Sequence, residues 1–380
     1  MQKTLVYDNS VSGHHLEYLH HFYERAHQVA SRKRQFVFVV PTEFKGCSKK
    51  MEWAKNENIS FVFFDVPAKT NAYWNSKKLA YFIKENNVTD VLLVALMGFL
   101  PWLPFFMPKG VKVSGIIYMI YLYRWQKSGF KTKLLDVLKY LIFKYCSCIN
   151  QVFLLNDKIA PKYLNKLFKT KKFDFLPDPV AVDVKTPVYD VRIELNVPAN
   201  ARFFSHFGGL AVRKGTLDIL EAINSFPQNF KNDYFVFAGR VGADIRERFY
   251  SLVSQVKEKG MNIIVKDEFI GYEFLKSLAA SSTAILIPYH NTEQSSGLIA
   301  YAAATGVPVI APCGGLLGKL VKRYKLGIFL EKSSCRVESI VKTLNLLNEG
   351  KLKIARSRIC GNDYLRDNSL EEFQRSVIGK

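Results

Sequence analysis

The sequence lacks several patterns that would each indicate a particular chemistry. The turn after its first predicted strand contains Gly13 as its only glycine, so the G-x-G-x-x-G fingerprint of dinucleotide binding is absent. The six cysteines form no C-x-x-C pair and no zinc-type spacing; they are Cys47, Cys146, Cys148, Cys313, Cys335 and Cys360. A signal-peptide pattern is missing too. We therefore expect reduced thiols in a cytoplasmic protein and disfavour a nicotinamide enzyme.

Long apolar runs are also missing. The longest, residues 91–107, is shorter than the roughly 20 residues of a membrane-spanning helix, and Pro101 and Pro104 interrupt it. We predict a buried strand over residues 91–96, followed by an apolar loop, and no transmembrane helix.

Acidic residues are scarce, since 33 Asp and Glu against 54 Lys and Arg give a formal net charge of +21. Such a charge implies an acidic partner: nucleic acid, an anionic bilayer surface or a phosphorylated ligand. Charge alone does not choose among the three. The 380 residues are too many for one core, so two domains are expected, and a hydrophobic content of 48% excludes intrinsic disorder.

Apolar strands alternate with helical segments twice along the chain. The first series lies at residues 4–7, 35–40, 59–66, 91–96, 113–117 and 151–155, and the second at 201–207, 234–238, 262–265, 284–287, 307–311 and 328–330. This alternation predicts two Rossmann-like α/β domains with parallel sheets. Three prolines between residues 177 and 187 indicate a linker. We place the domains at 1–185 and 186–355, with a tail at 356–380 that returns to the N-terminal domain.

The pattern of residues 284–312 predicts a strand, a loop, a helix over 297–305 and a second strand. The start of such a helix is an anion site, because its dipole and its unpaired N–H groups both point outward. In the loop, Ser295 and Ser296 add hydroxyl donors, and Gly297 lets a ligand approach the backbone. The alternative is that one of these serines is only the N-cap of the helix.

A second loop with suitable chemistry lies at residues 206–215, HFGGLAVRKG. Gly208 and Gly209 permit close approach at the carboxyl end of a strand, where ligands of open α/β sheets bind. Arg213 and Lys214 follow and can neutralise a diphosphate. Alone, this pair of cations would be read as solvated turn residues. Because two loops of one domain, each following a strand, can both bind an anion, we instead predict a binding site for a nucleoside diphosphate.

Residues 121–147 carry six basic residues against one acid, Asp136, interleaved with aromatic and aliphatic residues. The pattern suggests a basic amphipathic surface for anionic lipid headgroups. We assign the membrane surface to Arg124, Trp125, Lys127, Lys131 and Lys133. An ordinary surface helix with a solvated lysine face is the alternative.

Together the motifs of residues 200–330 resemble the C-terminal domain of GT-B glycosyltransferases of the family 4, or group 1, type. The G-x-L-x-x-x-K-G segment of that family matches residues 208–215, and its E-x7-E stretch running into A-x-x-x-G-x-P-V-I matches 293–310. The second glutamate falls at Tyr301, Gly318 stands where a glutamate is frequent, and Gly209 where an arginine often is. The resemblance implies two Rossmann-like domains facing each other across a cleft, with a C-terminal helix packing back on the N-terminal domain.

The resemblance also implies roles for individual residues. Arg213, Lys214 and Glu293 would be the catalytic group, the first two holding the donor diphosphate and Glu293 facing the sugar or ribose. Phe269 and Ile270 would border the base. The full nucleotide-sugar site would comprise Gly208, Gly209, Arg213, Lys214, Arg240, Phe269, Ile270, Tyr289, Glu293, Gln294, Ser295, Ser296 and Gly297. We expect Arg213 to supply the charge missing at Gly209.

In the N-terminal domain the resemblance places the turn at Gly13 toward the reacting sugar and the acceptor. His14 and His15 could bind phosphate or acceptor hydroxyls, although capping or packing at a helix start explains them equally well. Tyr118 is the polar residue nearest the position where this family often has a histidine. Because the sequence contains no D-x-D pair, we expect no metal and no cofactor beyond the nucleotide-sugar co-substrate.

These features predict a glycosyltransferase, hexosyltransferase-like, that moves a sugar from a nucleotide sugar to a lipid-linked or polysaccharide acceptor. Capsule, lipopolysaccharide or exopolysaccharide synthesis at the inner face of the cell membrane would be its setting, and the resemblance implies retention of configuration. Two alternatives stay open. A sugar-nucleotide 2-epimerase shares the fold but needs acid and base groups around the sugar. A basic nucleic-acid-binding protein would fit the charge, but no RRM, KH or helix-turn-helix pattern is present.

Overall fold

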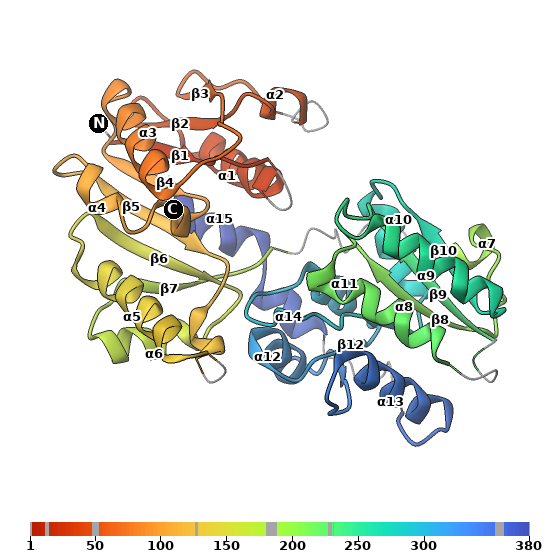
Figure 1. Cartoon of the computed structure of the whole chain (residues 1–380). Helices are drawn as coiled ribbons and strands as arrows, with labels where there is room; N and C mark the ends of the chain where they lie inside the picture. The colour runs from red at the N-terminus through yellow and green to blue at the C-terminus, as the bar shows by residue number, and fades with distance from the viewer. Residues whose placement is uncertain are drawn as a thin grey trace. The chain divides into compact units, whose positions relative to one another are not determined.

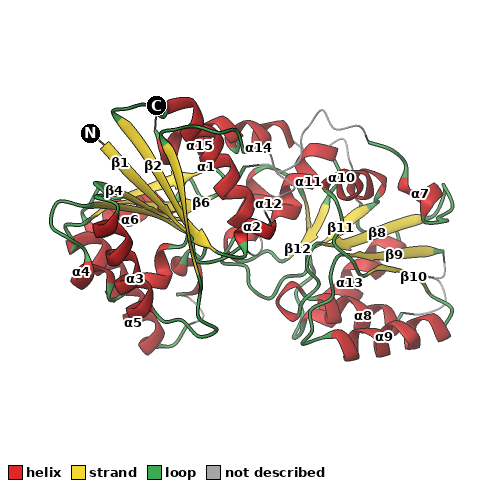
Figure 2. Cartoon of the chain, turned by 90° about the horizontal axis from the view of Figure 1, so that it is seen from above, coloured by secondary structure: helices red, strands yellow, loops and turns green. Residues whose placement is uncertain are grey.

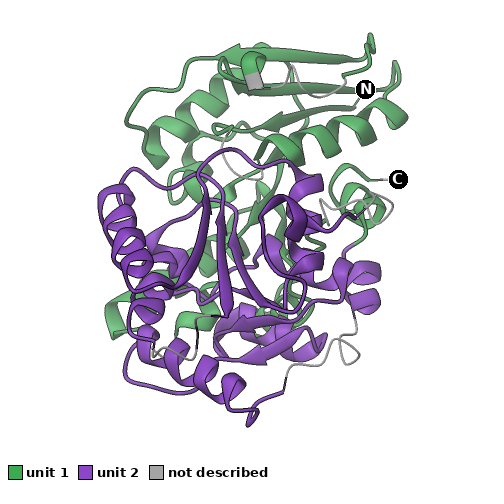
Figure 3. Cartoon of the chain, turned by 90° about the vertical axis from the view of Figure 1, so that its right-hand side faces the viewer, with its two compact units in different colours: residues 1–179, 369–380 green, residues 180–368 purple. Residues whose placement is uncertain are grey.

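The computed structural model describes residues 2–11, 15–47, 53–125, 128–179, 188–226, 230, 232–353 and 361–379. The chain divides into two compact units, coloured separately in Figure 3. Unit 1 comprises Met1–Pro179 and Ser369–Lys380, and unit 2 comprises Val180–Asn368. The fold class expected from the sequence is confirmed, because each unit is built on a parallel sheet covered by helices.

Unit 1 holds a seven-stranded sheet in the order β3-β2-β1-β4-β5-β6-β7, all of whose pairs are parallel. Its strands are β1 Gln2–Tyr7, β2 Arg34–Pro41, β3 Ile59–Phe64, β4 Asp90–Leu93, β5 Lys112–Ile117, β6 Ile149–Leu155 and β7 Phe173–Leu176. Residues 36–40 are fully buried, because helices cover both faces of the sheet (Figure 2).

The helices of unit 1 connect these strands (Figure 1). They are α1 His15–Val29, α2 Phe44–Cys47, α3 Ala72–Glu85, η2 Leu96–Phe99, α4 Leu103–Phe106, η3 Tyr121–Arg124, α5 Phe130–Tyr145, α6 Ala160–Phe168 and α15 Leu370–Ile378. None of the described helices is both long and apolar enough to cross a membrane.

One prediction for unit 1 is wrong, and one strand was not predicted. The apolar loop expected after β4 is two short helices, η2 and α4, in which Leu96, Phe99 and Leu103 are buried. Pro104 does not break α4, because it lies in the first turn, where its missing N–H is not needed. The sequence analysis also missed β7, whose four residues directly precede Pro177 and were too few to show an alternating pattern.

Unit 2 holds a six-stranded parallel sheet in the order β10-β9-β8-β11-β12-β13. Its strands are β8 Arg202–Phe207, β9 Asp233–Ala238, β10 Asn262–Lys266, β11 Ala284–Leu286, β12 Val309–Ala311 and β13 Gly327–Phe329. Its helices are α7 Val191–Glu194, η4 Val212–Lys214, α8 Thr216–Asn224, α9 Arg246–Glu258, α10 Tyr272–Ser281, α11 Gly297–Thr305, α12 Gly315–Arg323, α13 Arg336–Asn348 and α14 Gly361–Asp367.

The C-terminal segment contributes one helix to each unit. Helix α14 stays with unit 2, where the Tyr324 hydroxyl donates to Asp367 at 2.8 Å. Helix α15 belongs to unit 1 and packs on α1: Phe373 stacks on Phe22, and Gln374 Nε2 donates to the carbonyl of His21 at 3.0 Å. The return of the chain to the N-terminal unit therefore begins at Ser369, whereas the sequence placed the start of the tail at 356.

Candidate functional site

The centre of the unit 2 sheet places two loops side by side. Strand β8 lies between β9 and β11 and is hydrogen-bonded to both. The strands that follow β8 in sequence first extend the sheet on the β9 side, and from β11 onward they extend it on the other side. Such a reversal of strand order opens a crevice at the carboxyl ends of the strands, which is where ligands of open α/β sheets bind. Residues 208–215 follow β8, and residues 287–296 follow β11.

The loop after β8 is shaped by backbone close approach. Gly208 has φ +84°, and a Cβ on it would lie 3.0 Å from Lys214 Nζ. A Cβ on Gly239, after β9, would lie 2.1 Å from the Gly208 carbonyl oxygen, so that position needs glycine. Leu210 N–H donates to the Arg240 carbonyl at 2.9 Å, which holds Arg240 beside the glycine loop.

Lys214 is the buried cation of this loop, with only 9% of its surface exposed. Its ammonium lies over Gly208 and 5.9 Å from the centre of the Tyr289 ring. Within the described part of the chain, no carboxylate or carbonyl oxygen lies within hydrogen-bond reach of Nζ. A buried charge is costly unless it is paired. The site therefore suits an anionic ligand. Arg213, beside it, is exposed.

The two loops are joined by contacts around Gly215. Gly215 has φ +73°, and a Cβ on it would lie 2.5 Å from the Pro288 carbonyl oxygen. His290 N–H donates to the Arg213 carbonyl at 3.0 Å, and His290 Nε2 lies 2.8 Å from Asp218 Oδ2. The segments that the sequence predicted to share one ligand thus lie against each other.

A buried histidine, missed by the sequence analysis, links the same elements. His206, in β8, lies 2.9 Å from the Leu286 carbonyl through Nδ1 and 2.9 Å from Thr216 Oγ1 through Nε2. A carbonyl only accepts, so Nδ1 carries the proton and Nε2 accepts from the Thr216 hydroxyl. Thr216 Oγ1 in turn accepts from Ala211 N–H at 3.1 Å. Burial lowers the pKa of His206 to about 4, so the ring is neutral.

The loop after β11 ends in the cap of α11. Ser296 is the N-cap: its Oγ accepts from Leu298 N–H at 3.3 Å and donates to the Tyr289 hydroxyl at 3.1 Å. The capping interpretation therefore holds for Ser296, and its hydroxyl is already used. Glu293, Gln294 and Ser295 are partly exposed in the same loop, as is Gly297, the first residue of α11.

Tyr301 and Gly318 stand where the glycosyltransferases that the sequence resembles carry glutamate, and the structure gives a reason for each. Tyr301, on α11, is buried and makes an edge-to-face contact with Phe207 at 5.3 Å, so this position belongs to the core. A Cβ on Gly318 would lie 2.2 Å from the Cys313 carbonyl oxygen, which leaves no room for a side chain. Glu293 is therefore the one carboxylate that the chain keeps at the family's three glutamate positions.

The residues predicted beside the base follow β10. Phe269 is 69% exposed and Ile270 is partly exposed. Asp267, two residues earlier, accepts from Val241 N–H at 2.8 Å. This hydrogen bond, with the Tyr250 hydroxyl and Arg246, holds the pKa of Asp267 below its ordinary value.

A further cation missed by the sequence analysis, Arg336, donates from Nη2 to the Tyr289 carbonyl at 3.1 Å.

In unit 1, two predicted acceptor-side residues, Gly13 and His14, lie outside the described residues. His15 is described, and its Nδ1 lies 2.9 and 2.8 Å from the two carboxylate oxygens of Asp8, the first residue after β1. Burial raises the pKa of Asp8, while the hydrogen bond and charge of His15 oppose that shift. The Tyr118 ring lies 5.8 Å from the His15 ring, and burial raises the pKa of Tyr118.

The residues assigned to a membrane surface divide into two groups, and Lys127 lies outside the described residues. Arg124 Nε donates to buried Asp136 at 2.8 Å, and Trp125 contacts Tyr140 edge to face at 6.1 Å. Both residues thus hold η3 against α5 and do not form an open surface. Lys131 and Lys133 lie on α5 and are exposed and partly exposed.

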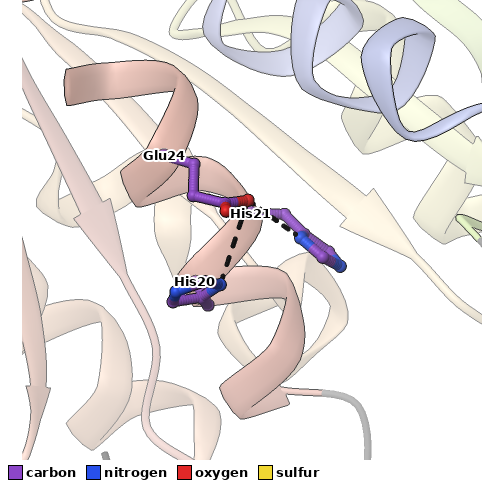
Figure 4. A group of neighbouring side chains, drawn as sticks. All are labelled: His20, His21 and Glu24. Carbon is purple, nitrogen blue, oxygen red and sulfur yellow. Dashed lines mark hydrogen bonds and ion pairs between the residues drawn. The ribbon is translucent and has the colours of Figure 1, made fainter. Parts of the chain in front are cut away.

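Figure 4 shows the group of potential metal ligands in the described residues, His20, His21 and Glu24 on α1, whose ligand atoms lie within 4.8 Å of one another. His21 lies between Glu17 and Glu24, 3.7 and 3.3 Å away. Burial lowers the pKa of His21, but these two carboxylates outweigh it and raise the pKa. Glu24 also accepts from Gln374 on α15. Ion pairing along the helix and the docking of α15 therefore account for the group.

Comparison with solved structures identifies the fold. No family model matches the chain, and no curated protein matches it in sequence. Solved structures match its whole length: a glycosyltransferase from Rickettsia africae at 15% identity (99% of this chain, 96% of that chain, TM-score 0.69) and WaaG, a glycosyltransferase of lipopolysaccharide biosynthesis, at 14% (100% of each, 0.67). HepE from Anabaena, in complex with UDP and glucose, matches at 12% (99% and 98%, 0.68). The chain therefore has the GT-B fold.

Proposed function

We propose that the chain is a glycosyltransferase that transfers a sugar from a nucleotide sugar to a lipid-linked or polysaccharide acceptor in cell-envelope synthesis. The observation that carries the proposal is Lys214, a lysine that is 9% exposed and makes no hydrogen bond or ion pair within the described residues, between two loops that meet at the switch point of the unit 2 sheet. Solved structures of the same fold bind UDP and UDP-glucose, which supports a nucleotide-sugar ligand.

The chemistry would be departure of a nucleoside diphosphate from the anomeric carbon. Negative charge develops on the leaving diphosphate, and charges fixed in advance stabilise it without reorganisation. Lys214, Arg213 and the N-terminal amides of α11 would supply them. Glu293 would face the sugar, and Arg240, Phe269 and Ile270 would border the nucleotide. We propose further that the transfer needs no metal ion and retains the configuration of the anomeric carbon.

Calorimetric titration with UDP, GDP, ADP and dTDP tests this site. We expect one of them to bind, and Lys214→Met to weaken this binding by about 10- to 100-fold, because the bound diphosphate loses a hydrogen bond from a charged donor. Lys257→Met, an exposed lysine on α9, is the matched control and should bind normally. Failure of all four nucleotides to bind the wild-type chain would refute the proposal.

We also propose that α5 docks unit 1 on an anionic membrane surface. Its exposed apolar residues define the α5 face: Phe130, Leu134, Leu135, Leu138 and Tyr145. Residues Asp136, Tyr140 and Phe143 are buried on the opposite side of the helix. At 100° per residue Lys133 and Lys144 fall on one flank of the α5 face, and Lys131 falls within it. Lys139, on the other flank, is paired with Asp136 at 3.7 Å. An outward apolar stripe with lysines within it and along one flank suits insertion among anionic headgroups.

Flotation with vesicles tests the docking surface. We expect the chain to bind phosphatidylcholine vesicles containing phosphatidylglycerol and to dissociate at high salt. Leu134→Glu with Leu138→Glu should abolish binding, whereas Ile193→Glu, at a still more exposed apolar residue in unit 2, should not. Binding that persists in the α5 double variant would refute the docking surface and leave the nucleotide site untouched.

A further inference from the structure

We propose that Cys146 and Cys148 form a reversible thiol–disulfide site, at which small-molecule disulfides convert the two thiols to an intramolecular disulfide. The site is a C-S-C segment at the junction where α5 ends and β6 begins (Figure 1). It lies wholly in unit 1 and does not depend on the proposed glycosyl transfer.

The two sulfur atoms lie in contact with each other. Their Sγ atoms are 2.9 Å apart, so a shift of under about 1 Å brings them to the roughly 2.05 Å of a disulfide bond. Within the described residues no other two cysteine sulfurs lie in contact. Cys146 and Cys148 are also partly exposed, which gives a small reagent access to them.

Backbone hydrogen bonds hold the segment in this arrangement. Cys146 is the C-cap of α5, and its N–H donates to the Ile142 carbonyl at 2.9 Å. Ile149 N–H donates to the Cys146 carbonyl at 3.2 Å, and the Cys148 carbonyl accepts from Val113 N–H, in β5, at 2.8 Å. The approach of the two sulfurs is therefore fixed by the way the helix joins the sheet.

The surroundings favour a thiolate on Cys146. A hydrogen bond from the Cys148 thiol lowers the pKa of Cys146, and the Ile149 N–H and the Lys172 charge act in the same direction, against burial. The Lys172 ammonium is held there because it donates to the Lys144 and Cys146 carbonyls, at 3.1 and 2.7 Å. The same thiol hydrogen bond raises the pKa of Cys148, which keeps its proton until Cys146 has reacted. An activated, accessible thiolate beside a second thiol is the arrangement of redox-sensitive cysteines.

The exchange takes two steps, with a small-molecule disulfide as the oxidant. The Cys146 thiolate attacks one sulfur of the reagent, whose S–S bond breaks, and one half leaves as a thiolate. Cys148 passes its proton to that thiolate and attacks Cys146 Sγ, the mixed disulfide breaks, and the second half leaves and is protonated by water. The two cysteines are thereby oxidised by two electrons, and the reagent is reduced to two thiols.

Peptide mapping of the full chain by mass spectrometry tests the site. The reduced chain is treated with oxidised glutathione at pH 7, and the remaining thiols are alkylated before digestion. The tryptic peptide of residues 145–158 contains both cysteines of the site and no others. We expect it to lose two hydrogens without gaining glutathione, and to regain them with dithiothreitol. A peptide that stays fully alkylated, while exposed Cys335 takes up glutathione, would overturn the proposal.

Single variants distinguish the roles of the two sulfurs. Cys148→Ser should trap glutathione on Cys146, because no second thiol resolves the mixed disulfide. Cys146→Ser should slow the reaction of this peptide by about 10-fold or more, because it removes the activated thiolate. Cys335→Ser, at an exposed cysteine of unit 2, is the matched control and should leave disulfide formation unchanged. Glutathione retained on the wild-type peptide, or a Cys146→Ser variant that reacts as fast as the wild-type chain, would refute the proposal.

Discussion

His206 donates a hydrogen bond from its buried Nδ1 to the carbonyl of Leu286, 2.9 Å away on the neighbouring strand. Through Nε2 the same ring accepts from Thr216, whose hydroxyl oxygen accepts from Ala211 N–H. One neutral side chain thus ties the glycine loop after β8 to the end of β11, from which the second loop departs.

Replacing His206 by Phe should loosen both loops at once. The Leu286 carbonyl would lose its hydrogen bond from Nδ1, and the Thr216 hydroxyl would lose its acceptor, so we expect about 2–3 kcal/mol of destabilisation. The affinity for the nucleoside diphosphate should fall with it. Denaturant unfolding and calorimetric titration measure the two effects, and a variant that keeps both values would show that the histidine does not order the loops.

The same histidine predicts a pH dependence of stability. Its pKa is about 4 in the folded chain against 6.5 in the unfolded chain, so the unfolded chain binds more protons between these values. The stabilisation is fully present above pH 6.5 and is lost as the pH falls toward 4, by about 3 kcal/mol in total. The free energy of unfolding of the wild-type chain minus that of His206→Phe should show this loss. A difference that stays constant from pH 7 to pH 4 would contradict it.

Two glycines of the same loop should respond differently to alanine. Gly215→Ala would place a Cβ 2.5 Å from the Pro288 carbonyl oxygen at φ +73°, so we expect at least about 2 kcal/mol of destabilisation. The matched change Gly209→Ala meets nothing within 4 Å and should be close to neutral for stability. Equal melting temperatures for the two variants would show that the contact between the loops is not needed.

Introducing a glutamate at position 301, where the glycosyltransferases that the sequence resembles carry one, should not raise activity. Tyr301→Glu would bury a carboxylate against Phe207, and we expect about 3 kcal/mol of destabilisation or more. Tyr301→Phe keeps the ring against Phe207 and serves as the control, which should lose much less stability. A stable Tyr301→Glu variant with higher turnover would mean that this position faces the sugar.

Arg124 should be structural and not part of a lipid-binding surface. Arg124→Met would take the bidentate partner from the buried carboxylate of Asp136 and leave it Lys139, 3.7 Å away, so we expect a cost of about 3 kcal/mol. Lys131→Met, an exposed lysine on α5, should leave stability unchanged and lower only the affinity for anionic vesicles. Thermal unfolding of both variants measures the contrast, and an Arg124→Met variant of normal stability would refute the structural role.

Local patterns predicted the elements of the fold well. Helix α11 has the bounds expected for residues 297–305, because Ser296 caps one end and Gly306, at φ +67°, ends the other. Strands rich in aromatic and β-branched residues were found within two or three residues of their ends. The elements missed were short ones, such as β7 and α4, whose burial depends on neighbours distant in sequence.

The sequence by itself determined the alternation of strands and helices, the two glycine- and serine-rich loops, and the excess of positive charge, because each is a property of neighbouring residues. Only the tertiary structure decided which charges are available. In the folded chain Arg124 pairs with Asp136 and Asp8 pairs with His15. Lys214 lies buried beside Gly208, and Tyr301 packs in the core against Phe207. Burial and pairing set the free energy of a charge, and both depend on which strands and helices become neighbours in the fold.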